Sequence, residues 1–271
     1  MSVNMTQRKK VTLGQLRKRY QENEPLVMLT CYDATFAYLE DEAGVDILLV
    51  GDSLGQTIQG HTSTLPVQIE DMVYHTQCVA RGNTNAFILA DMSFGSYLVS
   101  EDEAVANAVK LMKAGANMVK LEGGAPVLPI VRRLTQMGIP VCAHLGFTPQ
   151  SLNLFGGYFV QGKTEISASE LKSAALDMQE AGAAMVLFEM VPASVATEIT
   201  QLLSVPTIGI GAGPNCSGQV LVLQDILGIY PGRSPKFSKN FMKDSSSIQE
   251  AVSAYVHAVK SRVFPTMENS F

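Results

Sequence analysis

The chain has 271 residues, of which 46% are hydrophobic and 17% are charged. This length fits one large domain or two small ones, and the large apolar fraction excludes an intrinsically disordered chain. Twenty basic and 25 acidic residues give a formal net charge of −5, opposite in sign to that of a typical duplex-binding protein, so we predict no nucleic-acid partner.

The N-terminal region is basic, with clusters at residues 8–10 and 17–19. We predict a flexible arm over residues 1–10 and an extra helix from Thr12 to Glu22 that precedes the first strand. No apolar stretch lies before Val11, and no apolar run approaches the ~18 residues needed to span a bilayer. We therefore expect a cytoplasmic protein that does not enter a membrane.

Short apolar runs separated by amphipathic segments recur along the chain. Strands that are apolar on both faces and alternate with helices indicate a parallel sheet built from βαβ units. The runs are Leu26–Thr30, Ile47–Val50, Ala86–Ala90, Met118–Leu121, Ile139–Ala143, Ala184–Phe188 and Thr207–Ile210.

Two of the intervening helices have clear boundaries. Glu101–Ala114 begins with three acidic residues and ends before Gly115, an arrangement that suits the helix dipole and a left-handed C-cap. For Ser169–Ala181 we predict Ser169 as the N-cap and Gly182 as the residue that ends the helix.

One helix-to-strand phrase is repeated, as Glu-Ala-Gly-Val-Asp (42–46), Lys-Ala-Gly-Ala-Asn (113–117) and Glu-Ala-Gly-Ala-Ala (180–184), with the variant Gln-Met-Gly-Ile-Pro (136–140). Such recurrence is typical of a repeated β/α architecture. With an eighth strand expected within Arg233–Ser238, we predict a (β/α)8 TIM barrel. It forms one domain over residues 1–271, with the extra helix over its N-terminal end. The alternative is an open doubly wound sheet.

The four cysteines (Cys31, Cys78, Cys142 and Cys216) are far apart, and no Cys-x-x-Cys pair exists. This spacing argues against a zinc ribbon or a redox dithiol. We expect free thiols in a reducing compartment.

Polar residues follow the apolar runs at the points where the strands end. In a parallel barrel all strand C-termini open on one face, and this face holds the active site. We therefore expect the following side chains to converge there: Asp52, Asp91, Lys120, Glu122, His144 and Glu189.

The acids Asp52, Asp91 and Glu122 would repel one another if they were unpaired. A hard divalent cation removes this conflict, and Mg²⁺ prefers one or two carboxylates together with waters and a chelating substrate. We predict Asp52 and Asp91 as direct ligands, and Glu122 as a ligand either directly or through a water. The alternative for Asp52 is a capping role at the start of the following helix.

Lys120 and Glu122 are two residues apart on a strand and therefore face the same side. We expect the Lys120 amine to pair with a substrate carboxylate or a metal-bound acid, and we rank this above a Schiff base because nearby acids raise a lysine pKa. His144 is either a hydrogen-bond partner of the substrate or a satisfied core histidine.

Glu189 ends the most apolar strand and precedes Met190 and Val191. Such surroundings desolvate a carboxylate, a condition that suits a general base. The alternative is a structural glutamate bonded to a neighbouring loop.

Two further segments border the predicted site. Gly209–Gly213 (Gly-Ile-Gly-Ala-Gly) suits a phosphate site or the close approach of a flat ligand, but it lacks the Gly-x-Gly-x-x-Gly spacing. The long loop from Leu145 to Ser167 contains Phe155-Gly-Gly-Tyr158 and is a lid candidate.

Several motifs together resemble the ketopantoate hydroxymethyltransferase (3-methyl-2-oxobutanoate hydroxymethyltransferase) family over nearly the whole chain. They are Thr30-Cys-Tyr-Asp33, Val50-Gly-Asp-Ser-Leu-Gly55, Gly60-His-Thr-Ser-Thr-Leu-Pro66, Ala114-Gly-Ala-Asn-Met-Val-Lys-Leu-Glu-Gly-Gly124, His144-Leu-Gly-Phe-Thr-Pro-Gln150, Gly209-Ile-Gly-Ala-Gly213, Pro235-Lys-Phe237 and Ser270-Phe271. The chain departs from the family at Met92-Ser93-Phe94, where a proline usually precedes the phenylalanine.

The resemblance implies transfer of a hydroxymethyl group from 5,10-methylenetetrahydrofolate to 3-methyl-2-oxobutanoate. The products are 2-dehydropantoate and tetrahydrofolate, in the first committed step of pantothenate synthesis. It also implies a homo-oligomer, typically a homodecamer. The roles that it implies are Mg²⁺ binding by Asp52, Asp91 and Glu122, contact with the keto acid by Asp52, Ser53, Asp91 and Lys120, and proton acceptance by Glu189.

Two alternatives remain at this point. Magnesium barrels of the isocitrate lyase or phosphoenolpyruvate mutase type act on 2-oxo acids, but they carry a Lys-Lys-Cys-Gly-His loop that is absent here. A non-catalytic barrel could bind a metal-chelated acid without turning it over. Folate-dependent product formation distinguishes the transferase from both.

Overall fold

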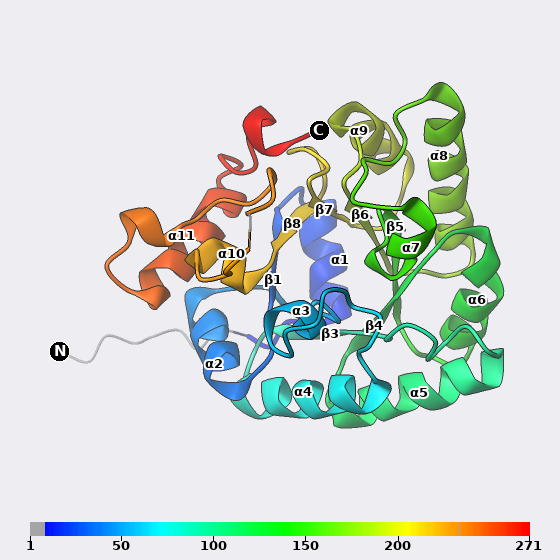
Figure 1. Ribbon diagram of the computed structural model, residues 1–271, viewed down its shortest axis with the longest axis horizontal. Coiled ribbons are helices and arrows are strands. Elements are labelled where there is room, and N and C mark those ends of the chain that lie inside the picture. Colours follow the sequence, from blue (N-terminus) through cyan, green and yellow to red (C-terminus); the bar gives the residue numbers. More distant parts are fainter. Residues whose placement is uncertain (1–8, 233) are drawn as a thin grey trace.

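The computed structural model describes residues 9–232 and 234–271 (Figure 1). Eight parallel strands close into a barrel in chain order, and β8 pairs with β1 to complete it. The strands are β1 (Leu26–Thr30), β2 (Ile47–Val50), β3 (Phe87–Asp91), β4 (Met118–Glu122), β5 (Val141–Gly146), β6 (Met185–Glu189), β7 (Thr207–Ile210) and β8 (Gly218–Leu221). The predicted (β/α)8 barrel is confirmed, and the open doubly wound sheet is wrong.

Helices surround the barrel, as Figure 1 shows for α4, α5, α6 and α8. The helices are α1 (Leu13–Gln21), α2 (Ala34–Ala43), α3 (Leu54–Thr57), α4 (Ile69–Gly82), α5 (Glu101–Ala114), α6 (Leu128–Gln136), α7 (Leu152–Phe155), α8 (Glu165–Glu180), α9 (Ala193–Leu202), α10 (Leu223–Leu227) and α11 (Ile248–Lys260). Helix α4 contacts β2 and β3, and α8 contacts β5 and β6. The strands are buried on both faces, which explains their continuous apolar runs.

The eighth strand is the one strand that the sequence misplaced. It is Gly218–Leu221, whereas residues 234–238 contain no strand and Arg233 lies outside the described residues. The connection between β7 and β8 spans only residues 211–217 and contains no helix. The strand therefore does not follow the strand–helix alternation from which we predicted its place.

Helix α1 covers the N-terminal end of the barrel, as predicted. Thr12 is its N-cap and forms a capping box with Gln15. Arg19 forms an ion pair with Asp46, which directly precedes β2, and the Tyr20 hydroxyl donates to the backbone carbonyl of Leu203 at 2.8 Å. These contacts fix α1 beneath the points where the strands begin.

The repeated helix-to-strand phrase has the same structure at each occurrence. Gly44, Gly115, Gly138 and Gly182 all adopt positive φ angles, between 79° and 119°. The N–H groups of each glycine and its successor bond back to the last helical turn, as Gly115 does to Met112 O at 3.1 Å. This is the left-handed C-cap, which glycine adopts without strain.

Helix α5 has the predicted bounds and ends at its glycine cap. Helix α8 begins earlier than predicted, at Glu165, because Thr164 accepts the N–H of Ser167 and forms a capping box with it. The prediction of Ser169 as the N-cap is therefore wrong. Ser169 lies inside the helix, where no orphan donor needs a cap.

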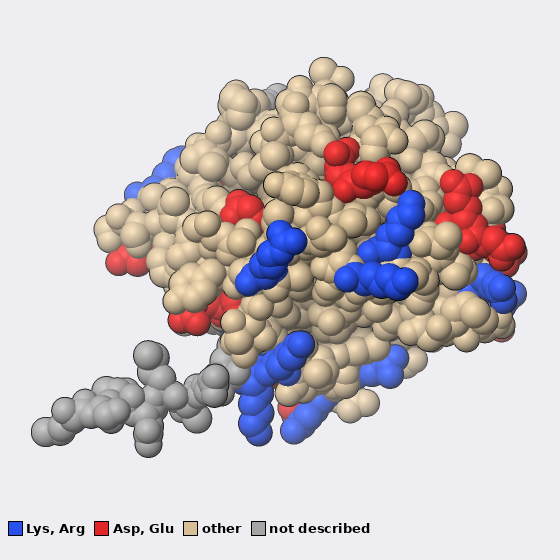
Figure 2. Space-filling view, turned by 90° about the horizontal axis from the view of Figure 1, so that it is seen from below, with Lys and Arg blue, Asp and Glu red and all other residues tan. Residues whose placement is uncertain are grey.

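Residues 1–8 of the predicted N-terminal arm lie outside the described residues. The four cysteines are free thiols, and none of the described helices has the length and apolarity to cross a membrane. On the face seen from below in Figure 2, acidic and basic side chains are interspersed within a larger uncharged area.

Glu40 on α2 is completely buried, and among the described residues only the weakly donating Cys31 thiol interacts with its carboxylate. Burial raises the pKa of Glu40 well above its ordinary value, so the folded protein holds this carboxyl neutral. The unfolded chain ionises it at lower pH. Folding therefore loses free energy as the pH rises above the unfolded-state pKa.

We predict that Glu40→Gln reduces the loss of stability between pH 5.5 and pH 8. In the unmodified protein this carboxyl contributes a loss of up to about 1.4 kcal/mol per pH unit above the unfolded-state pKa. Urea denaturation at both pH values measures the effect. Glu42→Gln, on the exposed side of the same helix, is the control. Parallel pH profiles for Glu40→Gln and the unmodified protein would contradict the prediction.

Candidate active site

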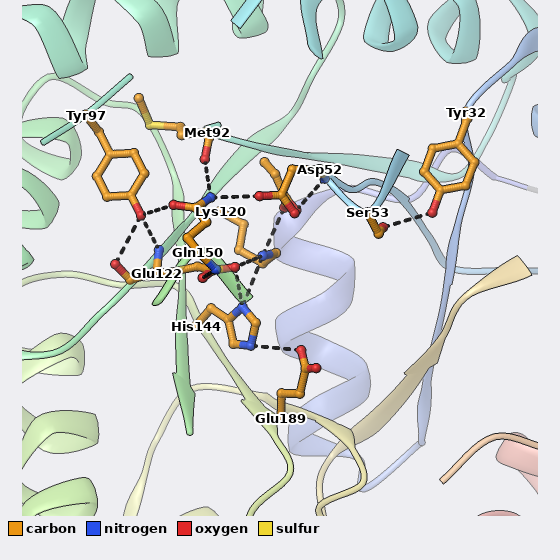
Figure 3. Close-up of polar contacts among 11 residues, drawn as sticks. Tyr32, Asp52, Ser53, Met92, Tyr97, Lys120, Glu122, His144, Gln150 and Glu189 are labelled. Carbon is orange, nitrogen blue, oxygen red and sulfur yellow. Dashed lines mark hydrogen bonds and ion pairs between the residues drawn. The ribbon is translucent and has the colours of Figure 1, made fainter. Parts of the chain in front are cut away.

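The residues predicted at the strand ends gather around one cavity of about 850 Å³ at the C-terminal end of the barrel. Figure 3 shows most of them pointing toward a common centre. The structure brings all the predicted site residues to this cavity: Asp52, Ser53, Asp91, Lys120, Glu122, His144 and Glu189. Their convergence from β2 to β6 agrees with the expected geometry of a parallel barrel.

Asp52 and Asp91 form the most buried acidic contact of the site. The backbone N–H of Asp52 donates to Asp91 Oδ2 at 3.0 Å, and the two residues are 3% and 2% exposed. Burial, together with repulsion from Asp91 and Glu122, raises the pKa of Asp52 well above its usual range. Burial also raises the pKa of Asp91, although Lys120 opposes the shift. The positive charge of Lys120 is therefore too small to keep the pKa values of both aspartates at their ordinary level.

The alternative role for Asp52 as a helix cap is wrong. Ser53, not Asp52, occupies the N-cap position of α3, and this helix has no side-chain cap hydrogen bond. The Asp52 carboxylate instead accepts the side-chain amide of Gln150 at 2.8 Å.

Lys120 lies among the acids as a buried counter-charge. Its Nζ atom is 3.2 Å from Asp91 Oδ1 and 3.9 Å from Glu122 Oε1. Burial lowers the pKa of Lys120, but Asp91, Glu122 and Asp52 outweigh it and raise the pKa above its ordinary value. A lysine held charged in this way pairs with acids and does not act as the neutral amine that a Schiff base requires.

Glu122 differs from the two aspartates because its neighbours together favour its ionised form. The backbone N–H of Gln150 donates to Glu122 Oε2 at 2.9 Å, and His144 Nδ1 lies 3.3 Å from Oε1. Burial raises the pKa of Glu122, but His144, Lys120 and Gln150 together lower it below its ordinary value. The remaining demand for a cation therefore lies with Asp52 and Asp91.

The donor set fits a hard cation such as Mg²⁺. Asp91 Oδ1 is a buried oxygen that lies 3.2 Å from Lys120 Nζ, but it forms no well-aligned hydrogen bond among the described residues. Carboxylate oxygens are the ligands that Mg²⁺ prefers, and one or two are sufficient when waters and substrate complete the shell. Across the described ranges no three His, Cys, Asp or Glu side chains form a ready metal-binding group. A cation at this site would thus rely on two aspartates and on its substrate.

His144 links Glu122 to Glu189. Its Nε2 atom lies 3.3 Å from Glu189 Oε2, opposite the contact that Nδ1 makes with Glu122 (Figure 3). Burial and Lys120 lower the pKa of His144, but the two glutamates raise it above its ordinary value. His144 thus contacts other residues of the site through both of its ring nitrogens.

Glu189 is less desolvated than its apolar strand predicts. Its side chain is 16% exposed and borders the cavity, because β6 ends at this residue. The carboxylate is thus accessible to a ligand while His144 holds its orientation. This combination of access and fixed orientation is what a proton acceptor needs.

Gln150 is a central residue of the site to which the sequence assigned no role. Besides binding Asp52 and Glu122, its side-chain amide donates to the backbone carbonyl of Met92 at 3.0 Å, and its Oε1 accepts the hydroxyl of Tyr97 at 2.6 Å. Gln150 lies in a 3₁₀ turn after β5. The motif containing it was visible, but strand-end spacing gives no signal for a residue that reaches the site from a loop.

Tyr32 positions Ser53 in a similar way. Their hydroxyls are 2.9 Å apart, and the backbone carbonyl of Tyr32 is 2.7 Å from His75 Nδ1. Burial raises the pKa of Tyr32 to about 12, so its hydroxyl stays protonated and can donate.

The two segments predicted to border the site do so in different ways. Within the loop from Leu145 to Ser167, Phe147 packs against Tyr158 with ring centroids 5.1 Å apart, and Tyr158 lines the cavity. In the Gly209–Gly213 segment, a Cβ atom on Gly211 would lie 2.9 Å from Phe237. The close approach there is that of the protein's own aromatic ring, which explains this glycine without a phosphate.

Comparison with known proteins gives this geometry a family context. Residues 10–267 match the sequence profile described as "Ketopantoate hydroxymethyltransferase". The chain belongs to this family. The 3-methyl-2-oxobutanoate hydroxymethyltransferase of Nitrosomonas europaea is 57% identical over 97% of this chain and 98% of its own length. The enzyme of the same name from Chromobacterium violaceum is 56% identical over 97% of this chain and its entire length.

Membership confirms the resemblance drawn from the motifs, and it makes the protein an enzyme of the hydroxymethyltransferase class. Ser93, at the position where the resemblance leads us to expect a proline, is buried. The turn is closed all the same, because the Ser93 carbonyl accepts the N–H of Ser96 at 3.0 Å and its hydroxyl at 2.7 Å.

Solved structures show that the fold is shared more widely. A phosphonopyruvate hydrolase bound to oxalate and Mg²⁺ superposes on this family member with a TM-score of 0.61, at 12% sequence identity. The superposition covers 78% of this chain and 81% of the hydrolase chain. A 2,3-dimethylmalate lyase of the PEP mutase/isocitrate lyase superfamily gives 0.55 over 77% and 80%, at 15% identity. At these identities the similarity concerns the fold alone.

We predict that Gln150→Met lowers kcat/KM for hydroxymethyl transfer by at least about tenfold. The change removes the amide donor to Asp52, and a hydrogen bond to a charged group contributes about 1.5–3 kcal/mol. Steady-state kinetics measure the loss, and thermal unfolding verifies that the variant is folded. Gln161→Met is the control, because Gln161 lies in the same loop and its side-chain amide donates to the Phe159 backbone carbonyl at 2.9 Å. A kcat/KM within twofold of the unmodified enzyme would refute this role.

Proposed function

We propose that this enzyme transfers a hydroxymethyl group from 5,10-methylenetetrahydrofolate to 3-methyl-2-oxobutanoate, giving 2-dehydropantoate and tetrahydrofolate. The relatives' names support the reaction. The observation that carries the proposal is the buried Asp52–Asp91 contact beside Lys120, with an accessible Glu189 on the same cavity. This site combines a demand for a cation with a base that can reach a small acid.

Magnesium is the metal that the donor set fits. Asp52 and Asp91 would hold it, with Glu122 beside them in a supporting position. When bound, Mg²⁺ supplies a Lewis acid that favours negative charge on the keto oxygen of the substrate. The raised pKa values of Asp52 and Asp91 support this assignment, because a bound cation would favour the ionised forms of both carboxylates.

The remaining chemistry is assigned to the side chains of the chain. Glu189 accepts the proton from C3 of the keto acid, and His144 holds the carboxylate in place through its 3.3 Å contact. Lys120 offsets the negative charge that builds up on the substrate oxygens. Carbon C3 then forms a bond to the folate methylene carbon, and water supplies the hydroxyl oxygen on that carbon. The two bonds from that carbon to the folate nitrogens break, and the nitrogens take up the proton removed from C3 and one proton of the water.

Glu189→Gln tests the base directly. In D₂O with Mg²⁺ we expect exchange at C3 of 3-methyl-2-oxobutanoate to fall by about 10²–10⁴-fold, the usual contribution of a general base. Binding of the keto acid changes little, because glutamine retains the shape of the side chain. NMR measures the exchange and calorimetry the binding.

The control is Glu170→Gln, an exposed glutamate on α8. Exchange in Glu189→Gln at the rate of the unmodified enzyme would remove Glu189 from the base role.

Removal of divalent metal is expected to abolish both C3 exchange and hydroxymethyl transfer, and added Mg²⁺ to restore them. Mg²⁺ with keto acid is also expected to raise the melting temperature, since a ligand that binds only the folded state stabilises it. Neither effect is expected in Asp52→Asn. Full exchange by the metal-stripped enzyme would show that the aspartates do not act through a cation.

A further inference from the structure

The cavity has two chemically different sides. The charged side lies at β2–β6 and holds the acids, Lys120 and His144. The other side is formed by β8 and the segments that follow it, and it is largely apolar. Its residues include Val220, Val222, Tyr230, Phe237 and Phe271. A volume of about 850 Å³ far exceeds the needs of a branched five-carbon acid and suits a drug-sized ligand.

Asp225 is the one charged acid on this apolar side. It lies on α10 directly after β8, borders the cavity and is 6% exposed. Burial raises the pKa of Asp225 to about 6. Within the part of the chain that the structure describes, its carboxylate has neither an ion pair nor a hydrogen bond. The other four acids on the cavity each contact a donor: Asp52, Asp91, Glu122 and Glu189.

The backbone holds Asp225 in a fixed position. The N–H of Leu223, at the start of α10, donates to Thr30 Oγ1 at 2.9 Å, which ties the helix to the end of β1. At the other end, Gly228 N–H donates to the Asp225 carbonyl at 3.1 Å. The Asp225 carboxylate borders the open cavity from a fixed backbone position, so a ligand there can supply the donors that its other contacts do not.

The chemistry of the surroundings limits what that ligand can be. A carboxylate accepts two parallel N–H bonds in a bidentate contact. Phe237, Phe271 and Tyr230 line the same side and are aromatic, so they can contact a flat ring, although Lys236 Nζ already lies over the Phe271 ring at 5.0 Å. The group that fits both requirements is a planar heterocycle with a ring N–H and an amino group side by side.

We propose that Asp225 binds the aminopyrimidinone edge of the reduced pterin, so that the β8 side of the cavity is the folate subsite. This inference rests on the proposed function, because folate enters there as the one-carbon donor. In the closed barrel β8 lies opposite β4, which carries Lys120 and Glu122. A pterin on Asp225 would therefore face the keto acid across the cavity, with Glu189 of β6 between the two sides.

The first test compares Asp225→Asn with the unmodified enzyme. Calorimetric titration with (6S)-tetrahydrofolate is expected to show a Kd at least tenfold higher in the variant, whereas the Kd of the keto acid with Mg²⁺ changes less than twofold. In steady state the KM for 5,10-methylenetetrahydrofolate rises. Asp244→Asn, at an exposed aspartate further along the chain, is the charge-matched control and is expected to leave both affinities unchanged.

The second test varies the ligand, and its first comparison uses only the unmodified enzyme. A tetrahydrofolate analogue with a methyl group in place of the 2-amino group is expected to bind the unmodified enzyme at least tenfold more weakly than tetrahydrofolate. In Asp225→Asn the two ligands are expected to differ much less, because the partner of the amino group is gone.

The outcomes separate the two proposals. If the unmodified enzyme binds tetrahydrofolate but Asp225→Asn binds it equally well, the subsite is wrong and the proposed function stands. Equal binding of the analogue and tetrahydrofolate to the unmodified enzyme also overturns the subsite. If the unmodified enzyme neither binds nor uses folate, the proposed function itself fails.

Discussion

The burial of several carboxylates at one end of the barrel is the constraint on which the site depends. Asp52, Asp91 and Glu122 are all within reach of a single ammonium, that of Lys120. One positive charge cannot satisfy three buried negative charges, so the protein distributes the remainder. Glu122 is stabilised by His144 and by a backbone N–H, whereas the two aspartates keep raised pKa values. The charges of the two aspartates are thus not fully compensated within the protein, and a cation can bind between them.

The register of the strands creates these contacts. Asp91 on β3 lies opposite Lys120 on β4, and Glu122 on β4 lies opposite His144 on β5. His144 in turn pairs with Leu187, two residues before Glu189 on the same face of β6. A shift of one residue between any two strands would turn these side chains to the outside of the barrel. At the opposite end of the barrel, buried Asp46 fixes the register of β1 and β2, because it accepts Val27 N–H at 3.0 Å and Lys260 Nζ at 2.7 Å.

The sequence predicts the features of the fold that hydrophobic periodicity and the handedness of the backbone determine. Seven buried strands, the repeated glycine caps and the convergence of strand-end side chains all follow from short-range patterns. It could not predict contacts that depend on the tertiary path of a loop. Gln150 reaches the site from a 3₁₀ turn, β8 follows β7 without a helix, and Gly211 is required by the packing of Phe237. None of these has a local period from which it can be recognised.

The acids around the cavity have different roles because they contact different partners. Glu122 contacts Lys120, His144 and the backbone N–H of Gln150, and it therefore maintains the positions of Lys120 and His144. Glu189 has one partner and an open side, so it can exchange a proton with a ligand. Asp225 has no partner among the described side chains, and it lies on the apolar wall. The same functional group thus takes different roles around one cavity, and the number of donors that each position already supplies determines which role it takes.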